Sequence, residues 1–240
     1  MKYILSIDQG TTGTTACLID AETFLFVGKI NQEYPQIYPH PSWVEHNLND
    51  IWSSVENTTR DLLRLYNVQG SQIAAIGITN QRETTCAFNR LGTPLANAIV
   101  WQDRRTNEFC TELKARPGLI DKIKKLTGLP IDPYFSATKM NWLLNNNSAV
   151  KEAAELNQLL FGTIDSFLLY KLSGHSAHKT DASNASRTML MDLKTSNWSH
   201  ELLELFGVKK EFLPSIEDSF GIFGKTKGLS FLPDGIPISG

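Results

Sequence analysis

Apolar residues at the start of the chain follow the short patterns that are typical of β-strands. Residues 3–8 are an apolar run that ends in an acidic residue, and a turn rich in glycine and threonine leads to a second run over residues 14–19. After another turn at residues 20–22, residues 25–33 would supply a third strand. The pattern therefore predicts an antiparallel meander of three strands.

A helix and a central strand come next. Apolar residues recur at intervals of three and four over residues 48–66, and Asn47 in front of them is a suitable N-cap. Residues 73–78 are almost continuously apolar, which is typical of a strand covered on both faces. Shorter strands are expected over residues 84–88 and 97–101. Together these elements indicate a mixed α/β sheet.

The rest of the chain has mostly helical periodicity. Four helices are predicted, over residues 104–115, 118–126, 137–145 and 163–172, with a loop over residues 145–148. The sequence has no internal repeat or low-complexity tract, and no shift in composition marks a domain boundary. We therefore treat residues 1–240 as one large lobe.

Composition excludes several classes of protein. The 240 residues are 41% hydrophobic and 20% charged, as in ordinary globular proteins. A net charge of -2 without any basic block argues against a nucleic-acid partner. The first apolar run is too short for a signal peptide, and no apolar stretch is long enough for a membrane span. The 3 cysteines have neither metal nor disulfide spacing, so we expect a reduced, cytoplasmic protein.

The first candidate site is Asp8-Gln9-Gly10-Thr11-Thr12-Gly13, where an acidic residue ends a strand and a glycine-bracketed turn follows. Backbone N–H groups in such a turn suit a phosphate, and glycine permits close approach and a positive φ. The carboxylate of Asp8 can hold a hydrated Mg²⁺ beside the phosphates. Ordinary hairpin chemistry is the alternative explanation.

A rival phosphate motif lies near the end of the chain. Residues 219–226 match a Walker A loop, except that Ser219 replaces the first glycine. The motif requires a strand before the loop and a helix after it, and neither is convincing here. A surface loop or hairpin is therefore the better interpretation.

A second candidate site is Asn80-Gln81-Arg82-Glu83, directly after the predicted strand over residues 73–78. Ligands of α/β sheets bind at the carboxyl ends of strands. Arg82 offers a rigid fork of donors and Glu83 offers acceptors, so the pair could bind adjacent hydroxyls of a polyol. Solvated surface charges are the alternative.

Two aromatic residues lie in similar positions before predicted helices. Trp101 could form one wall of a small-molecule pocket, with Asp103 capping the helix that follows. Tyr134 combines an aromatic ring with a hydroxyl in a loop before another helix, although a buried tyrosine has the same pattern.

Taken in order, these motifs closely resemble the glycerol kinase family. The resemblance rests on residues 8–12, 43–46, 77–85, 101–105, 128–129, 132–136 and 180–190. That family belongs to the carbohydrate kinases with an actin-like, ribonuclease H-like fold. The resemblance implies a mixed five-stranded-type sheet flanked by helices, as in the polyol-binding N-terminal lobe, with the C-terminal nucleotide lobe absent from this chain.

The resemblance also implies a role for each candidate residue. ATP phosphates would be bound by Gly10, Thr11, Thr12 and Gly13, with Asp8 near Mg²⁺ through water. Glycerol would be bound by Arg82, Glu83, Trp101 and Tyr134. Other sugar kinases usually have a Gln-Met-His-Gly type sequence where this chain has Gln81-Arg82-Glu83, which favours a three-carbon polyol. Thr15 stands where relatives usually have an arginine close to the phosphates.

The implied reaction transfers the γ-phosphoryl group of ATP to a terminal hydroxyl of glycerol. The family's catalytic base is an aspartate a few residues beyond the position of Gly240, so no catalytic residue is expected within this chain, which alone would be inactive. The full-length protein would be a homo-oligomer. Two alternatives stay open: a kinase for another sugar or polyol, and a non-catalytic actin-like nucleotide switch that needs no polyol pocket.

Overall fold

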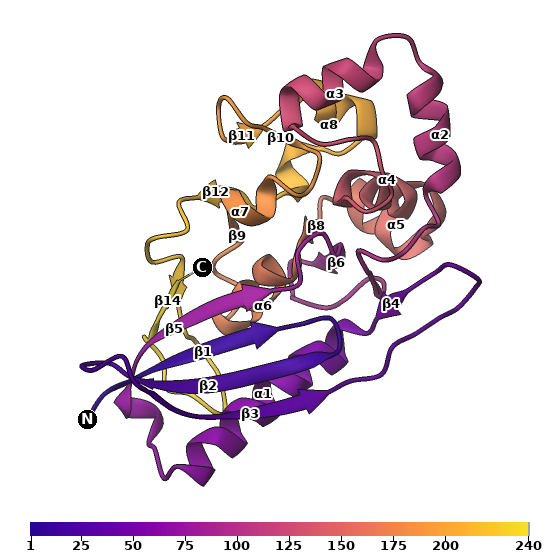
Figure 1. Ribbon diagram of the computed structural model, residues 1–240. Helices are drawn as coiled ribbons and strands as arrows, with labels where there is room; N and C mark the ends of the chain where they lie inside the picture. The colour runs from indigo at the N-terminus through magenta and orange to yellow at the C-terminus, as the bar shows by residue number, and fades with distance from the viewer. Residues whose placement is uncertain (240) are drawn as a thin grey trace.

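The computed structural model describes residues 1–239, which are built on one mixed six-stranded sheet (Figure 1). The strands lie in the order β13-β14-β5-β1-β2-β3. Their bounds are β1 (Tyr3–Gln9), β2 (Gly13–Asp20), β3 (Phe26–Glu33), β5 (Ile73–Asn80), β13 (Gly224–Lys225) and β14 (Pro237–Ser239). The predicted meander of β1, β2 and β3 is confirmed, and β5 pairs parallel to β1. The expected five-stranded type of sheet is extended by the short β13.

One face of the sheet carries the first apolar core. Leu5 and Ile7 of β1 are fully buried among side chains of α1 (Leu48–Leu65) and α6 (Ile164–Leu172). The side chain of Asn47 caps α1 as expected, because it accepts a hydrogen bond from the N–H of Asn49. The prediction that β5 is covered on both faces is wrong, since Ala74 is exposed. Its apolar run includes alanine and glycine, which have little side-chain surface to cover.

A second apolar core lies among the helices above the carboxyl ends of β1 and β5 (Figure 1). It is built by α2 (Asn107–Ala115), α3 (Leu119–Thr127), α4 (Ser136–Asn146), α5 (Ser148–Glu155) and α8 (His200–Phe206), together with the pair β6 (Cys86–Asn89) and β8 (Leu159–Gly162). The helix α5 was not predicted. In place of the loop expected at 145–148, only Asn147 separates α4 from α5. Its side chain accepts a hydrogen bond from the N–H of Val150 and caps the start of α5.

Two predicted strands exist but lie outside the main sheet. The segment expected at 84–88 is β6, which pairs with β8. The segment expected at 97–101 is the short β7 (Ala98–Ile99), which pairs with β4 (Glu45–His46). Their short apolar runs indicated strands but did not identify the pairing partner.

The remaining elements are short. They are the strands β9 (Lys179–Asp181), β10 (Met191–Asp192), β11 (Asn197–Trp198) and β12 (Ser215–Glu217), the helix α7 (Ala182–Ala185), and two 3₁₀ turns at Gly70–Gln72 and Lys210–Phe212. None of the helices within residues 1–239 combines the length and the apolar character that crossing a bilayer requires.

The segment that resembles a Walker A loop is a loop that leads into a strand of the main sheet. Phe220 within it is 97% exposed, and β13 at its end pairs antiparallel with β14. The interpretation as a loop is therefore confirmed, because this segment leads into a strand and not into a helix. The expectation that no strand precedes it is wrong, since the short β12 ends at Glu217.

Candidate active site

The candidate phosphate turn, residues 10–13, joins β1 to β2 at the carboxyl end of β1. Asp8 is exposed just before it, opposite Thr15 on β2 and Thr79 on β5. The N–H of Gly10 donates to the carbonyl of Gly13 over 2.9 Å, which closes the turn. The structure therefore brings the predicted phosphate-binding residues and Asp8 to one edge of the sheet.

Of the two reasons for glycine in this turn, close approach and a positive φ, the structure shows only close approach, at Gly13. Neither Gly10 nor Gly13 has a positive φ among the described glycines, so that expectation is wrong. A Cβ on Gly13 would lie 2.6 Å from the carbonyl oxygen of Gln32 on β3. Close approach of two backbones is the physical reason for Gly13.

A network of buried polar side chains stabilises the turn. The carbonyl of Gly10 accepts hydrogen bonds from the hydroxyl of Tyr34 at 2.5 Å, from Nε2 of Gln9 at 2.8 Å and from Nε2 of Gln81 at 3.2 Å. Burial raises the pKa of Tyr34 to about 12, so its hydroxyl keeps its proton near neutral pH. The turn thus rests on neutral groups.

His46 continues this network. Its Nε2 lies 2.6 Å from Oε1 of Gln36, and its Nδ1 lies 3.3 Å from Nε2 of Gln81. Burial lowers the pKa of His46 to about 4, which leaves the ring neutral at physiological pH. Because the Nε2 of Gln36 donates to the carbonyl of Thr11 over 3.0 Å, the histidine supports the turn indirectly.

Glu83, predicted to bind a polyol, is buried with only 3% of its surface exposed. Its carboxylate Oε1 accepts from Nε of Arg187 over 2.6 Å, an ion pair between residues 104 positions apart. The backbone of Glu83 has φ of 63°, and its carbonyl accepts from the hydroxyl of Ser136 over 2.9 Å. The alternative of a solvated surface charge is therefore wrong for Glu83.

The two predicted aromatic residues lie against each other. The ring centroids of Trp101 and Tyr134 are 5.5 Å apart. The guanidinium of Arg187 lies 5.6 Å from the ring centroid of Tyr134, so Arg187 links Glu83 to Tyr134, and Tyr134 in turn contacts Trp101. Nε1 of Trp101 donates to the hydroxyl of Thr11 over 3.0 Å, which connects this aromatic pair to the turn.

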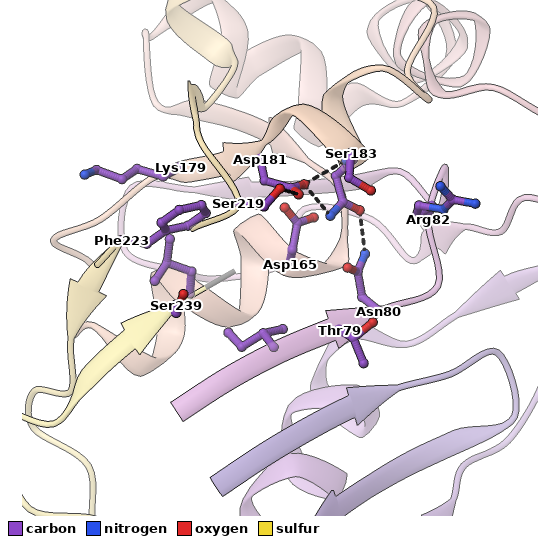
Figure 2. A pocket seen from close by; sticks show the side chains of 13 residues that line it. Thr79, Asn80, Arg82, Asp165, Lys179, Asp181, Ser183, Ser219, Phe223 and Ser239 are labelled. Carbon is purple, nitrogen blue, oxygen red and sulfur yellow. Dashed lines mark hydrogen bonds between the residues drawn. The ribbon is translucent and has the colours of Figure 1, made fainter. Parts of the chain in front are cut away.

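Arg82, the fourth predicted polyol residue, lines a cavity of about 510 Å³ at the carboxyl end of β5 (Figure 2). Arg82 lies at one end of the cavity and Lys179 at the other, with Asp165 and Asp181 between them. Glu83, Trp101, Tyr134 and residues 10–13 are not among its lining residues. The structure therefore brings three of the four predicted polyol residues together and places Arg82 beside them.

Two buried carboxylates in this cavity were not found by sequence reasoning. Asp165 accepts hydrogen bonds from the hydroxyls of Thr163 and Thr180, the second at 2.6 Å, and burial raises its pKa to about 6. Asp181 caps α7 through the N–H of Asn184 at 2.8 Å. Asp181 also accepts from the hydroxyl of Ser219, 38 positions along the chain. The Thr180-Asp181 motif was a signal for Asp181 only, and nothing in the sequence marked Asp165.

The expectation that Asp103 caps α2 is wrong. The helix begins at Asn107, whereas Asp103 is buried and pairs with Arg105 over 2.8 Å. Asp103 also accepts from the N–H of Val44 over 2.7 Å, and the Arg105 guanidinium lies 3.8 Å above the ring of Trp43. This cluster anchors the loop that follows Trp101.

The residues around Asp8 fit one kind of metal ion. No group of three or more histidine, cysteine or acidic side chains within residues 1–239 could enclose a metal. A single exposed carboxylate beside the candidate phosphate turn would suit Mg²⁺, which typically keeps several waters and is shared between one or two carboxylates and substrate phosphates.

This architecture is that of the actin-like, ribonuclease H-like sugar kinases. Residues 3–240 match the N-terminal domain of the FGGY family of carbohydrate kinases, and the chain belongs to that family.

Among its relatives, the glycerol kinase of Myxococcus xanthus (strain DK1622) is 48% identical over 240 residues, which are 100% of this chain and 48% of that protein. The solved structure of Plasmodium falciparum glycerol kinase with ADP has a TM-score of 0.92 and 34% identity, covering 100% of this chain and 48% of that one. The solved structure of gluconate kinase from Lactobacillus acidophilus has a TM-score of 0.86 and 27% identity, covering 99% of this chain and 47% of that one. The chain thus spans about half the length of the curated relatives it matches.

Proposed function

We propose that the whole protein is a glycerol kinase that transfers the γ-phosphoryl group of ATP to a terminal hydroxyl of glycerol. The observation that carries the proposal is the buried Glu83 carboxylate beside Tyr134 and Trp101, next to a turn suited to phosphates. The likeness to glycerol kinases over the full length of this chain supports the same substrate.

Charged side chains would hydrogen-bond the hydroxyls of glycerol, and aromatic rings would pack along its carbon atoms. Arg82 would donate to a hydroxyl from the cavity side, and Glu83 would accept from another. Trp101 and Tyr134, with centroids 5.5 Å apart, would pack against the carbon skeleton. A site built to hydrogen-bond several hydroxyls discriminates strongly against analogues that lack one of them.

ATP would be bound by the turn over residues 10–13. Backbone N–H groups and the hydroxyls of Thr11 and Thr12 would contact the phosphates, and the buried network below keeps the turn in one conformation. Mg²⁺, held through water by Asp8, would neutralise charge on the phosphates when bound. The half of the relatives' length beyond this match would supply the adenine site and the base that accepts the proton from glycerol.

The test is a competition assay with the whole protein, ATP and Mg²⁺. We expect kcat/KM for glycerol to exceed that for gluconate and xylulose by about 100-fold or more. A higher kcat/KM for either sugar would favour the alternative of another carbohydrate kinase. Absence of any phosphoryl transfer with retained ATP binding would favour the actin-like nucleotide switch.

Two further properties are part of this proposal. We place the protein in the cytoplasm, where ATP and reduced thiols are available, since all 3 cysteines are free. We also expect the whole protein to be a homo-oligomer, which sedimentation analysis would test directly.

A further inference from the structure

Glu83 is held in an unfavourable environment for a carboxylate. Its backbone lies in the left-handed region with φ of 63°, and its side chain is 4% exposed. A left-handed non-glycine residue and a buried charge each cost free energy, and both persist only where neighbouring groups hold them. The residues that hold Glu83 therefore bear directly on what its carboxylate can bind.

Arg187 is the counterion of this carboxylate. Nε of Arg187 donates to Oε1 of Glu83 over 2.6 Å, and the arginine side chain is 28% exposed. The guanidinium lies 4.9 Å from the ring centroid of Phe135 and 5.6 Å from that of Tyr134. Its position is thus fixed on one side by the carboxylate and on the other by two rings.

Several hydrogen bonds bring Arg187 to this place. Asn80 donates to Asn184 over 2.9 Å, which fixes the segment of Arg187 to the end of β5, three residues before Glu83. The carbonyl of Thr188 accepts from the N–H of Ala137 over 2.8 Å at the start of α4. The end of β5, the start of α4 and the segment after α7 are therefore locked together around the pair.

We propose that Arg187 is a positioning residue of the polyol site, which holds one oxygen of the Glu83 carboxylate so that the other is presented to a hydroxyl of the substrate. This inference rests on the proposed glycerol kinase function. The bond uses Nε and Oε1, and the second oxygen of Glu83 takes no part in it. Arg187 acts through Glu83 and need not touch the substrate itself.

The chemistry of the pair requires arginine at this position. The planar guanidinium lies against two rings while it donates from a rigid edge, and it stays charged at all relevant pH values. Lysine would supply a charge but neither the planar contact nor the fixed direction of the donor. Loss of the pairing would leave a buried carboxylate free to turn away from the substrate.

The test is a double-mutant cycle in the whole protein, with Arg187→Met, Glu83→Gln and the double variant, and with Arg187→Lys as a charge-preserving variant. We expect Arg187→Met to raise KM for glycerol by about ten-fold or more, and Arg187→Lys to raise it less, with KM for ATP changed less than two-fold. In the Glu83→Gln background, Arg187→Met should change KM for glycerol by less than about two-fold, because its partner is already altered.

Thermal unfolding of each variant gives a second readout. If Arg187→Met is too unstable to assay, Arg187→Lys and the double variant, which buries no unpaired charge, carry the test. Fully additive effects on KM, or equal effects on both substrates, would overturn the positioning role. A wild-type protein that fails to phosphorylate glycerol would instead reject the proposed function, and the cycle would then be measured with the carbohydrate it does phosphorylate.

Discussion

The turn over residues 10–13 and the Glu83–Arg187 pair lie at neighbouring strand ends, but different interactions stabilise them. Neutral groups hold the turn, and the key supports Gln9, Tyr34 and Gln81 converge on one carbonyl. An ion pair between residues 104 positions apart holds the Glu83 carboxylate. If the turn binds phosphates through its N–H groups, its supporting groups need no negative charge, whereas a site for neutral hydroxyls would benefit from a charged acceptor.

The largest effect is expected at the tightest point of the turn. In Gly13→Ala the new Cβ would meet the carbonyl oxygen of Gln32 at 2.6 Å, and this oxygen belongs to the backbone of β3, which cannot move aside as a flexible side chain could. We expect the free energy of unfolding to fall by about 3 kcal/mol and KM for ATP to rise more than KM for glycerol. Urea unfolding and steady-state kinetics measure both.

The matched control for this substitution is Gly77→Ala on β5. A Cβ there meets no atom within 4 Å, so we expect little change in stability or in either KM. If both variants lose the same stability, the close approach at Gly13 is not the cause.

A smaller effect is expected when one support of the turn is removed. Tyr34→Phe deletes the hydroxyl that donates to Gly10 and lies within hydrogen-bond distance of Gln9 and Gln81. We expect a loss of about 1–2 kcal/mol in stability and a rise in KM for ATP, with KM for glycerol unchanged. Tyr38→Phe is the control, because Tyr38 is 67% exposed. An equal rise in both KM values for Tyr34→Phe would contradict separate supports for the two regions.

The contact between the two regions should have a still smaller effect. Trp101→Phe removes the hydrogen bond to the Thr11 hydroxyl and keeps an aromatic ring against Tyr134. We expect a loss of about 1 kcal/mol in stability, with both KM values raised a few-fold, because Trp101 contacts the turn directly and contacts the ion pair through Tyr134. A change confined to one substrate would show that Trp101 does not connect them.

The change in stability caused by His46→Gln should be the smallest of these at pH 7. At lower pH, the stability difference should shift in favour of the variant. Burial lowers the pKa of His46 to about 4 from 6.5, so the unfolded chain binds a proton that the folded chain does not. Stability must therefore decrease as the pH falls from 6.5 to 4.

Glutamine can replace the donor and acceptor of His46 without titrating, so the variant should lose less stability over this pH range. Part of the dependence remains in the variant, because burial also lowers the pKa of His178 to about 4. Urea midpoints at several pH values measure the difference. Parallel pH profiles for the two proteins would mean that His46 is not the group responsible.

The sequence predicted the turn better than the ion pair, for a physical reason. Residues 8–13 are contiguous, so a strand end, an acidic residue and two glycines are visible together. Arg187 has no local signal for its role, because its partner is brought to it by the packing of β5, α4 and α7. For the same reason, β6 and β7 were predicted as strands but not assigned to their partners.

Errors in the predicted elements also have physical causes. Asp103 before a helical pattern looks like a cap, but burial beside Arg105 gives it an ion-pair role that spacing cannot reveal. The apolar run of β5, which contains small residues, predicted a strand covered on both faces, but Ala74 is exposed. Periodicity identifies an apolar run but does not determine how deeply its small side chains are buried.

The most direct test of the central claim, that Glu83 binds a glycerol hydroxyl, is calorimetric titration of glycerol into the whole protein and into Glu83→Ala. The control is Glu108→Ala, an exposed acidic residue on α2. Loss of a charged hydrogen-bond acceptor should weaken binding by about 1.5–3 kcal/mol, or roughly 10- to 150-fold, and the control should bind like wild type. Equal affinity of Glu83→Ala and wild type would contradict the claim.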